Sequence, residues 1–322
     1  MELLLSLIAS CANNPHTMSK TNQRSPSEPF KIAQSMRIGH VSLNVFNLER
    51  SLDFYQKVLG FKVVAKSWEK ALLSAAGEES QSYLVELLQA KANSDRDTID
   101  PLALGKRAGL YHFAILLPER KYLADMLQNL DANRDRVYFD GFADHLVSES
   151  IYIRDPDFNG IEIYRDRPAS EWNWDGNKIE MATLPLNTDD LLREATDKKW
   201  KEMPPKTTIG HVHLHVRSIP KAISFYRDIL GLNLTATIPS AAFFAADKYH
   251  HHIATNTWLG TDILPASPQS IGLNHFGIVL PSKEEFERLG NQLSKYDQDI
   301  SFSEKSHFVY DVHGIKIQVE YK

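Results

Sequence analysis

A histidine, a tyrosine and a glutamate that could carry chemistry occur together between His145 and Glu162. The β-branched and aromatic content of Ser150–Arg154 is typical of a strand, Asp155–Gly160 has turn chemistry, and Ile161–Tyr164 begins a second strand. Glu162 stands between two isoleucines, so it alternates onto one sheet face and is a poor choice for burial unless another group pairs with it. From this alternation alone, the simpler interpretation is a glutamate that faces solvent.

The residue types also limit which metals the chain can bind. Cys11 is the one cysteine, which excludes a disulfide framework and a thiolate metal site. Any bound metal must therefore use histidine and carboxylate ligands. Such ligands favour Fe(II), Mn(II) or a histidine-bound zinc.

The positioning elements form an internal repeat. The segment 38–45 (IGHVSLNV) recurs at 209–216 (IGHVHLHV), and the following 52–60 (LDFYQKVLG) recurs at 223–231 (ISFYRDILG). A second pair is 109–118 (GLYHFAILLP) and 272–281 (GLNHFGIVLP). Each copy reads as a strand followed by a helix, and short strands follow. The sequence thus predicts an α+β fold of four βαβββ units, which begin near residues 37, 109, 209 and 272.

These units suggest four segments of chain. Residues 1–36 are expected to be a disordered leader, with a weak signal-like apolar run at the start. Residues 37–170 form a predicted first domain of two units. Residues 171–206 form a linker with a short helix, and residues 207–322 form a second domain of two units. The apolar run is too short to span a bilayer, and we expect a cytoplasmic protein, although Ile8–Cys11 resembles a lipoprotein cleavage box.

The overall composition is that of a soluble globular protein. The 322 residues include 43% hydrophobic and 24% charged residues, with a formal net charge of −5. No basic patch with interleaved aromatic residues is present, so we expect no nucleic-acid partner. A homo-oligomer is possible.

The stretch from His145 to Glu162 closely resembles the signature of the extradiol ring-cleavage dioxygenases. The matching residues are His145, Ile151-Tyr152, Asp155-Pro156 and Glu162, while Phe158 and Ala143 depart from the usual pattern. Four βαβββ units in two pairs resemble the vicinal oxygen chelate (glyoxalase/bleomycin resistance/extradiol dioxygenase) superfamily, and within it the two-domain bacterial catechol 2,3-dioxygenases.

This resemblance implies a metal held by first-strand histidines and a last-strand carboxylate. The matching first-strand histidines are His40, His112, His211 and His275. His112 with Glu162 supplies two ligands, and the third is His211 or His40, with His211 favoured. Aligning Gly314 with Gly160 puts Lys316 opposite Glu162, which predicts a weak or dead site in the fourth unit.

The resemblance also implies the reaction. It predicts Fe(II), or Mn(II), which binds a catechol and O₂ for ring opening to a muconic semialdehyde-type product. A histidine of the 250–252 run, His250 or His251, is the expected acid–base residue, and His145 and Tyr152 are expected near the bound oxygen species. His213 and His215 are expected only as polar lining.

Two other functions remain open on this fold. A glyoxalase-like isomerase or thiol transferase would use a second carboxylate on a late strand, for which Glu86 is the candidate. A non-catalytic binding protein would need no metal ligands.

Overall fold

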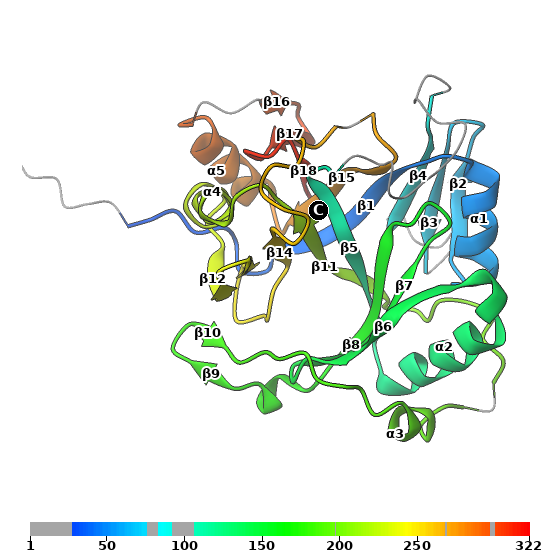
Figure 1. Cartoon of the computed structure of the whole chain (residues 1–322). Coiled ribbons are helices and arrows are strands. Elements are labelled where there is room, and N and C mark those ends of the chain that lie inside the picture. Colours follow the sequence, from blue (N-terminus) through cyan, green and yellow to red (C-terminus); the bar gives the residue numbers. More distant parts are fainter. Residues whose placement is uncertain (1–27, 76–82, 92–105, 197, 268, 297–299) are drawn as a thin grey trace, which may run out of the picture.

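A computed structural model describes residues 28–75, 83–91, 106–196, 198–267, 269–296 and 300–322 (Figure 1). Within these residues the four predicted βαβββ units are present, so the predicted fold class is confirmed. Unit 1 consists of β1 (Arg37–Val45), α1 (Leu48–Lys57), β2 (Lys62–Lys66), β3 (Lys70–Ser74) and β4 (Val85–Gln89). Unit 2 consists of β5 (Gly109–Leu116), α2 (Arg120–Ala132), η2 (Arg134–Arg136), β6 (Tyr138–Asp144), β7 (Ser148–Arg154) and β8 (Gly160–Asp166).

The second half of the chain repeats this order after a structured linker. The linker contains η3 (Ala169–Glu171), β9 (Trp174–Asp175), β10 (Lys178–Ile179) and α3 (Thr188–Leu192). Unit 3 consists of β11 (Thr208–His215), α4 (Ile219–Ile223), η4 (Ser224–Ile229), β12 (Asn233–Ile238), β13 (Ala241–Ala245) and β14 (Ile253–Asn256). Unit 4 consists of β15 (Gly272–Leu280), α5 (Lys283–Leu293), β16 (Ile300–Phe302), β17 (Ser306–Tyr310) and β18 (Lys316–Tyr321).

Local sequence accounts for the helix boundaries. The side chain of Asn47 accepts a hydrogen bond from the Arg50 amide and caps α1. Leu52 and Tyr55 lie on its buried face. The chain leaves this helix at Gly60, whose φ of +86° is a left-handed conformation that glycine adopts without strain. Gly231 has the same role after η4, with φ of +80°.

Two eight-stranded sheets combine the units across the two halves of the chain. One has the order β16-β17-β18-β15-β1-β4-β3-β2, and the other has the order β12-β13-β14-β11-β5-β8-β7-β6. In Figure 1 the blue and orange-red ends of the chain therefore share one sheet, and the green and yellow parts share the other. The cause is the antiparallel pairing of first strands, β1 with β15 and β5 with β11. Each sheet therefore joins one unit of residues 37–170 to one unit of residues 207–322, and units 2 and 3 share the sheet that brings His211 near His112.

Each helix of the first and third units reaches the turn between two strands of the other sheet. The Tyr55 hydroxyl of α1 donates to Asp155 Oδ2 at 3.0 Å, and Arg50 forms an ion pair with Asp157. These aspartates precede β8. The equivalent contact in the other half is the Tyr226 hydroxyl, which donates to Asp311 Oδ2 at 3.0 Å before β18. The two sheets are therefore joined by reciprocal buried contacts.

The segment just before β1 is ordered, which shortens the predicted leader. Ile32 and Met36 are buried, and the Ile32 amide donates to the Gly231 carbonyl at 3.2 Å. Polar composition led to the prediction of disorder up to residue 36, but the apolar residues of this segment pack on unit 3. The rest of the predicted leader, residues 1–27, lies outside the described residues. No helix in the described ranges combines the length and the apolar character needed to span a membrane.

Candidate metal centre

Two imidazoles and a carboxylate converge between units 2 and 3. His112 is on β5, Glu162 on the adjacent parallel strand β8, and His211 on β11, which pairs with β5 on its other side. Glu162 Oε2 lies 3.0 Å from His112 Nε2 and 2.9 Å from His211 Nε2. Within the described residues, these three side chains form the group whose ligand atoms all lie within 4.8 Å of one another. His40, the alternative third ligand, is not in this group.

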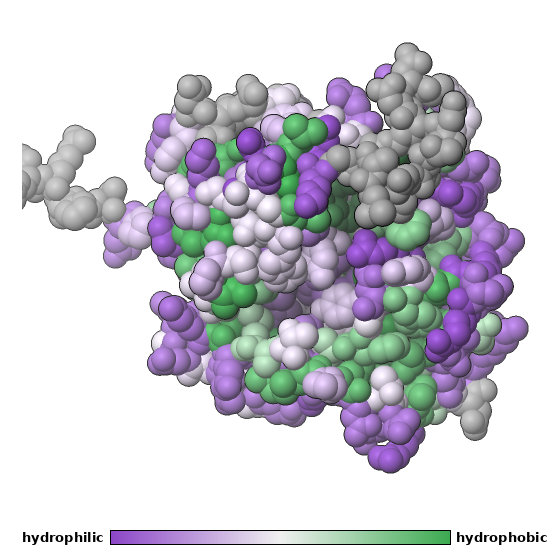
Figure 2. Space-filling view, viewed as in Figure 1, coloured by the Kyte–Doolittle hydropathy of each residue, from purple (hydrophilic) through white to green (hydrophobic). Residues whose placement is uncertain are grey.

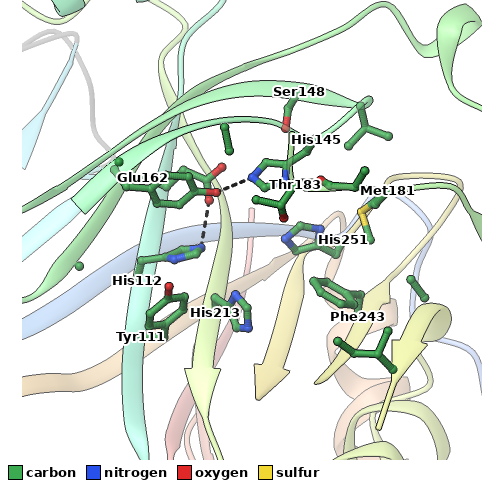
Figure 3. Close-up of a pocket in the computed structure, with 18 of the residues that line it drawn as sticks. Tyr111, His112, His145, Ser148, Glu162, Met181, Thr183, His213, Phe243 and His251 are labelled. Atoms are coloured by element: carbon green, nitrogen blue, oxygen red, sulfur yellow. Dashed lines mark hydrogen bonds and ion pairs between the residues drawn. The ribbon is translucent and has the colours of Figure 1, made fainter. Parts of the chain in front are cut away.

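Close packing of the strands fixes the carboxylate. A Cβ on Gly160 would come within 2.1 Å of the Tyr111 carbonyl oxygen, so β8 can lie this close to β5 only with glycine there. The Ser150 hydroxyl on β7 donates to Glu162 Oε1 at 2.6 Å. Oε1 is thereby occupied, and Oε2 lies 3.0 Å from His112 Nε2 and 2.9 Å from His211 Nε2. Figure 3 draws the contact between Glu162 and His112.

The three side chains are almost completely buried, with 5%, 2% and 2% of the surface of His112, Glu162 and His211 exposed. Burial alone would raise the pKa of Glu162, but the two histidines outweigh it and hold the pKa well below its usual range. Burial lowers the pKa of His211 to about 4, although Glu162 opposes this shift. The cluster therefore consists of an anionic carboxylate and an imidazole that is neutral at pH 7.

A divalent cation fits this group. Nδ1 of His112 and Nδ1 of His211 are buried without a hydrogen-bond partner, and His112 Nε2 lies 3.0 Å from Glu162 Oε2 without forming a hydrogen bond. Such unpaired polar atoms are costly in a protein interior. A cation among the two Nε2 atoms and Glu162 Oε2 would give His112 Nε2 a partner for its lone pair and would neutralise the carboxylate. Two histidines and one carboxylate also match the ligand set of non-haem iron oxygenases.

His145 and Tyr152 lie beside this cluster and are hydrogen-bonded to each other. His145 Nδ1 is 2.7 Å from the Ala182 carbonyl oxygen, which can only accept, so this nitrogen carries the proton. In the neutral ring, His145 Nε2 then accepts from the Tyr152 hydroxyl at 2.7 Å. Burial and the charge of Glu162 raise the pKa of Tyr152 well above 10, so the phenol keeps its proton.

The histidine run 250–252 lies in a loop before β14, and His250 and His251 are buried. His250 Nε2 donates to Asp166 Oδ1 at 2.9 Å, which leaves His250 Nδ1 as an acceptor in the neutral ring. His251 Nδ1 lies 2.9 Å away and donates to it. His251 Nε2 consequently carries a lone pair that can accept a proton. The ring centroid of His251 is 4.2 Å from that of His211. Of the two candidate acid–base residues, His251 lines a cavity beside the cluster. His250 accepts the hydrogen bond from His251 and thereby orients the His251 ring.

A cavity of about 780 Å³ opens in front of the cluster. In Figure 3, Glu162, His112 and His213 lie on one side and His251 and Phe243 on the other, with His145 above. Apolar and aromatic residues form much of the wall: Phe142, Ile179, Met181, Phe243 and Trp258. Residues 178–183 of the linker thus form part of the wall. In Figure 2, apolar residues gather on the lower part of the visible face, around β6–β8.

The other sheet has a related but different group. His40 Nε2 on β1 is 3.3 Å from His275 Nε2 on β15. On β5, the residue two positions after His112 is Ala114, and it pairs with Glu162. On β15, the residue two positions after His275 is Gly277, and it pairs with Gln318. Gln318, and not Lys316 as predicted, therefore occupies the position of Glu162, and an amide replaces the carboxylate.

Glu86, the candidate second carboxylate, belongs to this other group. It accepts from the Ser42 hydroxyl at 2.7 Å and pairs in register with Ser42 on β1. In the sheet that contains His112 and Glu162, the residue at the position of Glu86 is Ala254, which pairs in register with His213. Glu86 therefore cannot join His112 and Glu162, and its predicted role as a second carboxylate at this site is wrong.

Ser150, Asp166 and Asn256 are polar residues near the cluster that the sequence analysis did not identify. Ser150 stands two residues before Tyr152 on the same strand face, and this alternation was the available signal. Asp166 and Asn256 are brought to the histidines only by folding, and no local motif marks them.

Comparison with known proteins places the chain in a family. The model of the Glyoxalase/Bleomycin resistance protein/Dioxygenase superfamily matches residues 37–163 and 208–317. A catechol-2,3-dioxygenase of Bacillus subtilis (strain 168) is 39% identical over 284 residues, which cover 87% of this chain and 95% of that protein. A lactoylglutathione lyase of Neisseria meningitidis is 30% identical over 141 residues, or 42% of this chain and 95% of that protein.

Solved structures share the fold. A glyoxalase I mutant from Zea mays superposes with a TM-score of 0.53 at 16% identity and covers 89% of this chain and 94% of that one. The cppA protein from Streptococcus pneumoniae TIGR4 has a TM-score of 0.52 at 13% identity and covers 91% and 99%. The predicted similarity to catechol 2,3-dioxygenases is confirmed, and the chain belongs to the Glyoxalase/Bleomycin resistance protein/Dioxygenase superfamily.

Proposed function

We propose that the chain is an extradiol ring-cleavage dioxygenase that opens a catechol-type ring beside its two hydroxyl groups. The ring carbon–carbon bond next to the diol breaks, and both atoms of O₂ enter a muconic semialdehyde-type acid. The proposed ligands of Fe(II) are His112, His211 and Glu162, and Mn(II) is the alternative metal. When bound, such an ion would supply open coordination positions and a route for electrons between the diol and O₂.

The observation that carries this proposal is the three-residue set of His112, Glu162 and His211, in which His112 and Glu162 line the cavity. An isomerase of this fold would use a further carboxylate from a late strand, but Ala254 stands at that position in this sheet. The similarity to the Bacillus subtilis catechol-2,3-dioxygenase over 95% of its length supports the same conclusion.

The chain's own residues supply the proton transfers. His251 Nε2 faces the cavity as an acceptor and would take a proton from the bound diol and later return it. His250 and Asp166 hold the imidazole in this tautomer through two hydrogen bonds of 2.9 Å. Burial lowers the pKa of His251 well below its usual value, which keeps it neutral before the reaction.

His145 and Tyr152 form the opposite polar wall. The Ala182 carbonyl fixes the His145 proton on Nδ1, so the Tyr152 hydroxyl is directed to His145 Nε2. This pair would hold the reacting oxygens in place and exclude water from that side. The apolar residues of the cavity would enclose the aromatic ring.

The test is anaerobic reconstitution with Fe(II), followed by catechols and air. We expect the chain to consume one O₂ for each catechol molecule and to form a yellow ring-fission product. Thiol-dependent isomerisation without O₂ uptake would instead support the glyoxalase-like alternative. Ligand binding that is unchanged by a chelator would support a binding protein.

A matched pair of variants tests the ligand assignment. His211→Ala should lose bound iron, whereas His40→Ala should retain it, because His40 contacts His275 in the other sheet. Iron content measured by elemental analysis distinguishes them. Equal retention in both variants would contradict the proposed ligand set.

A further inference from the structure

His213 lies in the cavity wall, two residues beyond His211 on β11 and directly opposite His112 in the strand register. Its ring centroid is 5.0 Å from that of His112 (Figure 3). It is 4% exposed. A buried imidazole beside a ligand histidine could be a further ligand, an acceptor or a donor. Its hydrogen bonds distinguish these roles.

Asn256 determines where the His213 proton is. The backbone N–H of Trp258 donates to Asn256 Oδ1 at 3.1 Å, and His215 Nδ1 lies 2.7 Å from the same oxygen. The backbone donor identifies this atom as the oxygen, so the amide nitrogen faces His213 Nε2 at 3.0 Å. An amide nitrogen can only donate, so His213 Nε2 accepts. The proton of the neutral ring is therefore on Nδ1.

Aromatic side chains pack around the His213 ring. Tyr111 and Trp258 contact it with centroids at 5.0 Å and 5.2 Å, and Phe243 contacts it at 5.9 Å. Within the part of the chain that the structure describes, His213 Nδ1 forms no hydrogen bond, and it is not sealed off from the cavity that His213 lines. The Nδ1–H group of His213 is thus available to the cavity.

We propose that His213 is a further catalytic residue, whose Nδ1–H donates a hydrogen bond to an oxygen of the bound diol. This inference rests on the proposed function. His213 is not a fourth metal ligand, because one nitrogen accepts from Asn256 and the other carries the proton. It provides a donor where His251 provides an acceptor, so the two imidazoles are complementary partners for a vicinal diol.

Two isosteric variants separate the nitrogens of His213. In His213→Asn, the side-chain amide reaches about as far as Nδ1 and keeps a donor toward the cavity. In His213→Gln, the amide reaches about as far as Nε2, so the contact to Asn256 is kept and the cavity donor is lost. The measurement is the anaerobic Kd of 4-nitrocatechol for the Fe(II)-loaded full chain, from its absorbance change, together with iron content.

We expect His213→Gln to weaken 4-nitrocatechol binding about 10- to 100-fold, the loss typical of a hydrogen bond to a charged group. His213→Asn should stay within about threefold of the unsubstituted chain, and both variants should keep their iron. Equal losses in the two variants, no loss in His213→Gln, or loss of iron in either would overturn the inference.

A second measurement does not depend on catalysis. Nitrogen-15 spectra of the Zn(II)-loaded chain with labelled histidine, assigned by difference against His213→Gln, should show a protonated Nδ1. Asn256→Asp replaces the amide donor with an acceptor and should move the proton to Nε2. A protonated Nε2 in the unsubstituted chain would refute the inference. If the chain binds no catechol at all, the proposed function fails, and the spectra still decide the tautomer.

Discussion

Replacing Glu162 with Gln is the most direct perturbation of the proposed metal centre. The substitution preserves the shape of the side chain and an oxygen that can accept from Ser150, but it removes the anion between the two imidazoles. Because Glu162 is 2% exposed, solvent cannot replace the lost charge. We therefore expect a large effect on metal affinity and a small effect on the metal-free fold.

The magnitude follows from burial. Removing one partner of a buried ionic pair costs about 3–5 kcal/mol, which corresponds to a roughly 200- to 5,000-fold weaker Kd for the metal. At a free metal concentration of about 100 times the original Kd, bound metal stabilises the fold by about 2.7 kcal/mol. A 200-fold weaker Kd reduces this to about 0.2 kcal/mol. The metal-induced rise in Tm should therefore almost disappear.

The assay is anaerobic titration calorimetry with Fe(II), together with thermal unfolding with and without metal. The matched control is Glu86→Gln, which removes a buried carboxylate that also accepts from a serine, but in the other sheet. We expect this control to keep the original metal affinity and the metal-induced rise in Tm. A Glu162→Gln variant that binds Fe(II) with unchanged Kd would refute the reasoning.

Three further predictions concern the two related groups of the two sheets. Gln318→Glu should add a second, weaker metal site, so the metal-to-protein ratio should rise toward two; a ratio that stays at one at saturating metal would contradict this. Ser150→Ala should weaken metal binding about 10- to 100-fold because the carboxylate loses its orienting hydroxyl, whereas Ser42→Ala should not, as calorimetry can measure. Burial lowers the pKa of His40 to about 3 and that of His275 to about 4, so the unfolded chain binds more protons below pH 6.5. Their contribution to stability is present above pH 6.5 and lost as the pH falls toward 4, by up to about 1.4 kcal/mol per pH unit for each ring. Denaturant unfolding between pH 7 and 4.5 should show a shallower decline when both are replaced by Gln, and an unchanged decline would disprove this assignment.

The repeats made the fold and the first two members of the cluster predictable. His112 and Glu162 meet because the first and last strands of one unit are parallel neighbours, which is a property within the unit. The identity of the third member, His211 or His40, depends on whether unit 2 shares its sheet with unit 3 or with unit 1. All four first strands have similar sequences, so nothing local distinguishes the pairing of β5 with β11 from the alternative. The histidine run near residue 251 was the signal that favoured His211.

The fourth unit shows why glycine was a misleading guide to register. The buried aspartate of the turn fixes the register, because Asp155 and Asp311 each accept from backbone amides two and four residues later. Gly314 therefore matches Phe158, and both have positive φ, +84° and +63°. A phenylalanine in a conformation that favours glycine hid this correspondence in the sequence.

The buried contacts from α1 to the turn before β8 give unit 1 a supporting role for the proposed ligand Glu162. Asp155 and Asp157 are anchored by Tyr55 and Arg50 of unit 1, which contributes nothing to the ligand set. Damage to that distant helix should therefore loosen the strand bearing the carboxylate. A shortened chain that keeps only units 2 and 3 would retain every proposed ligand. It would lack the contacts from α1 that support the turn before β8, the strand of Glu162. Engineering a minimal version of this protein would have to rebuild that support first.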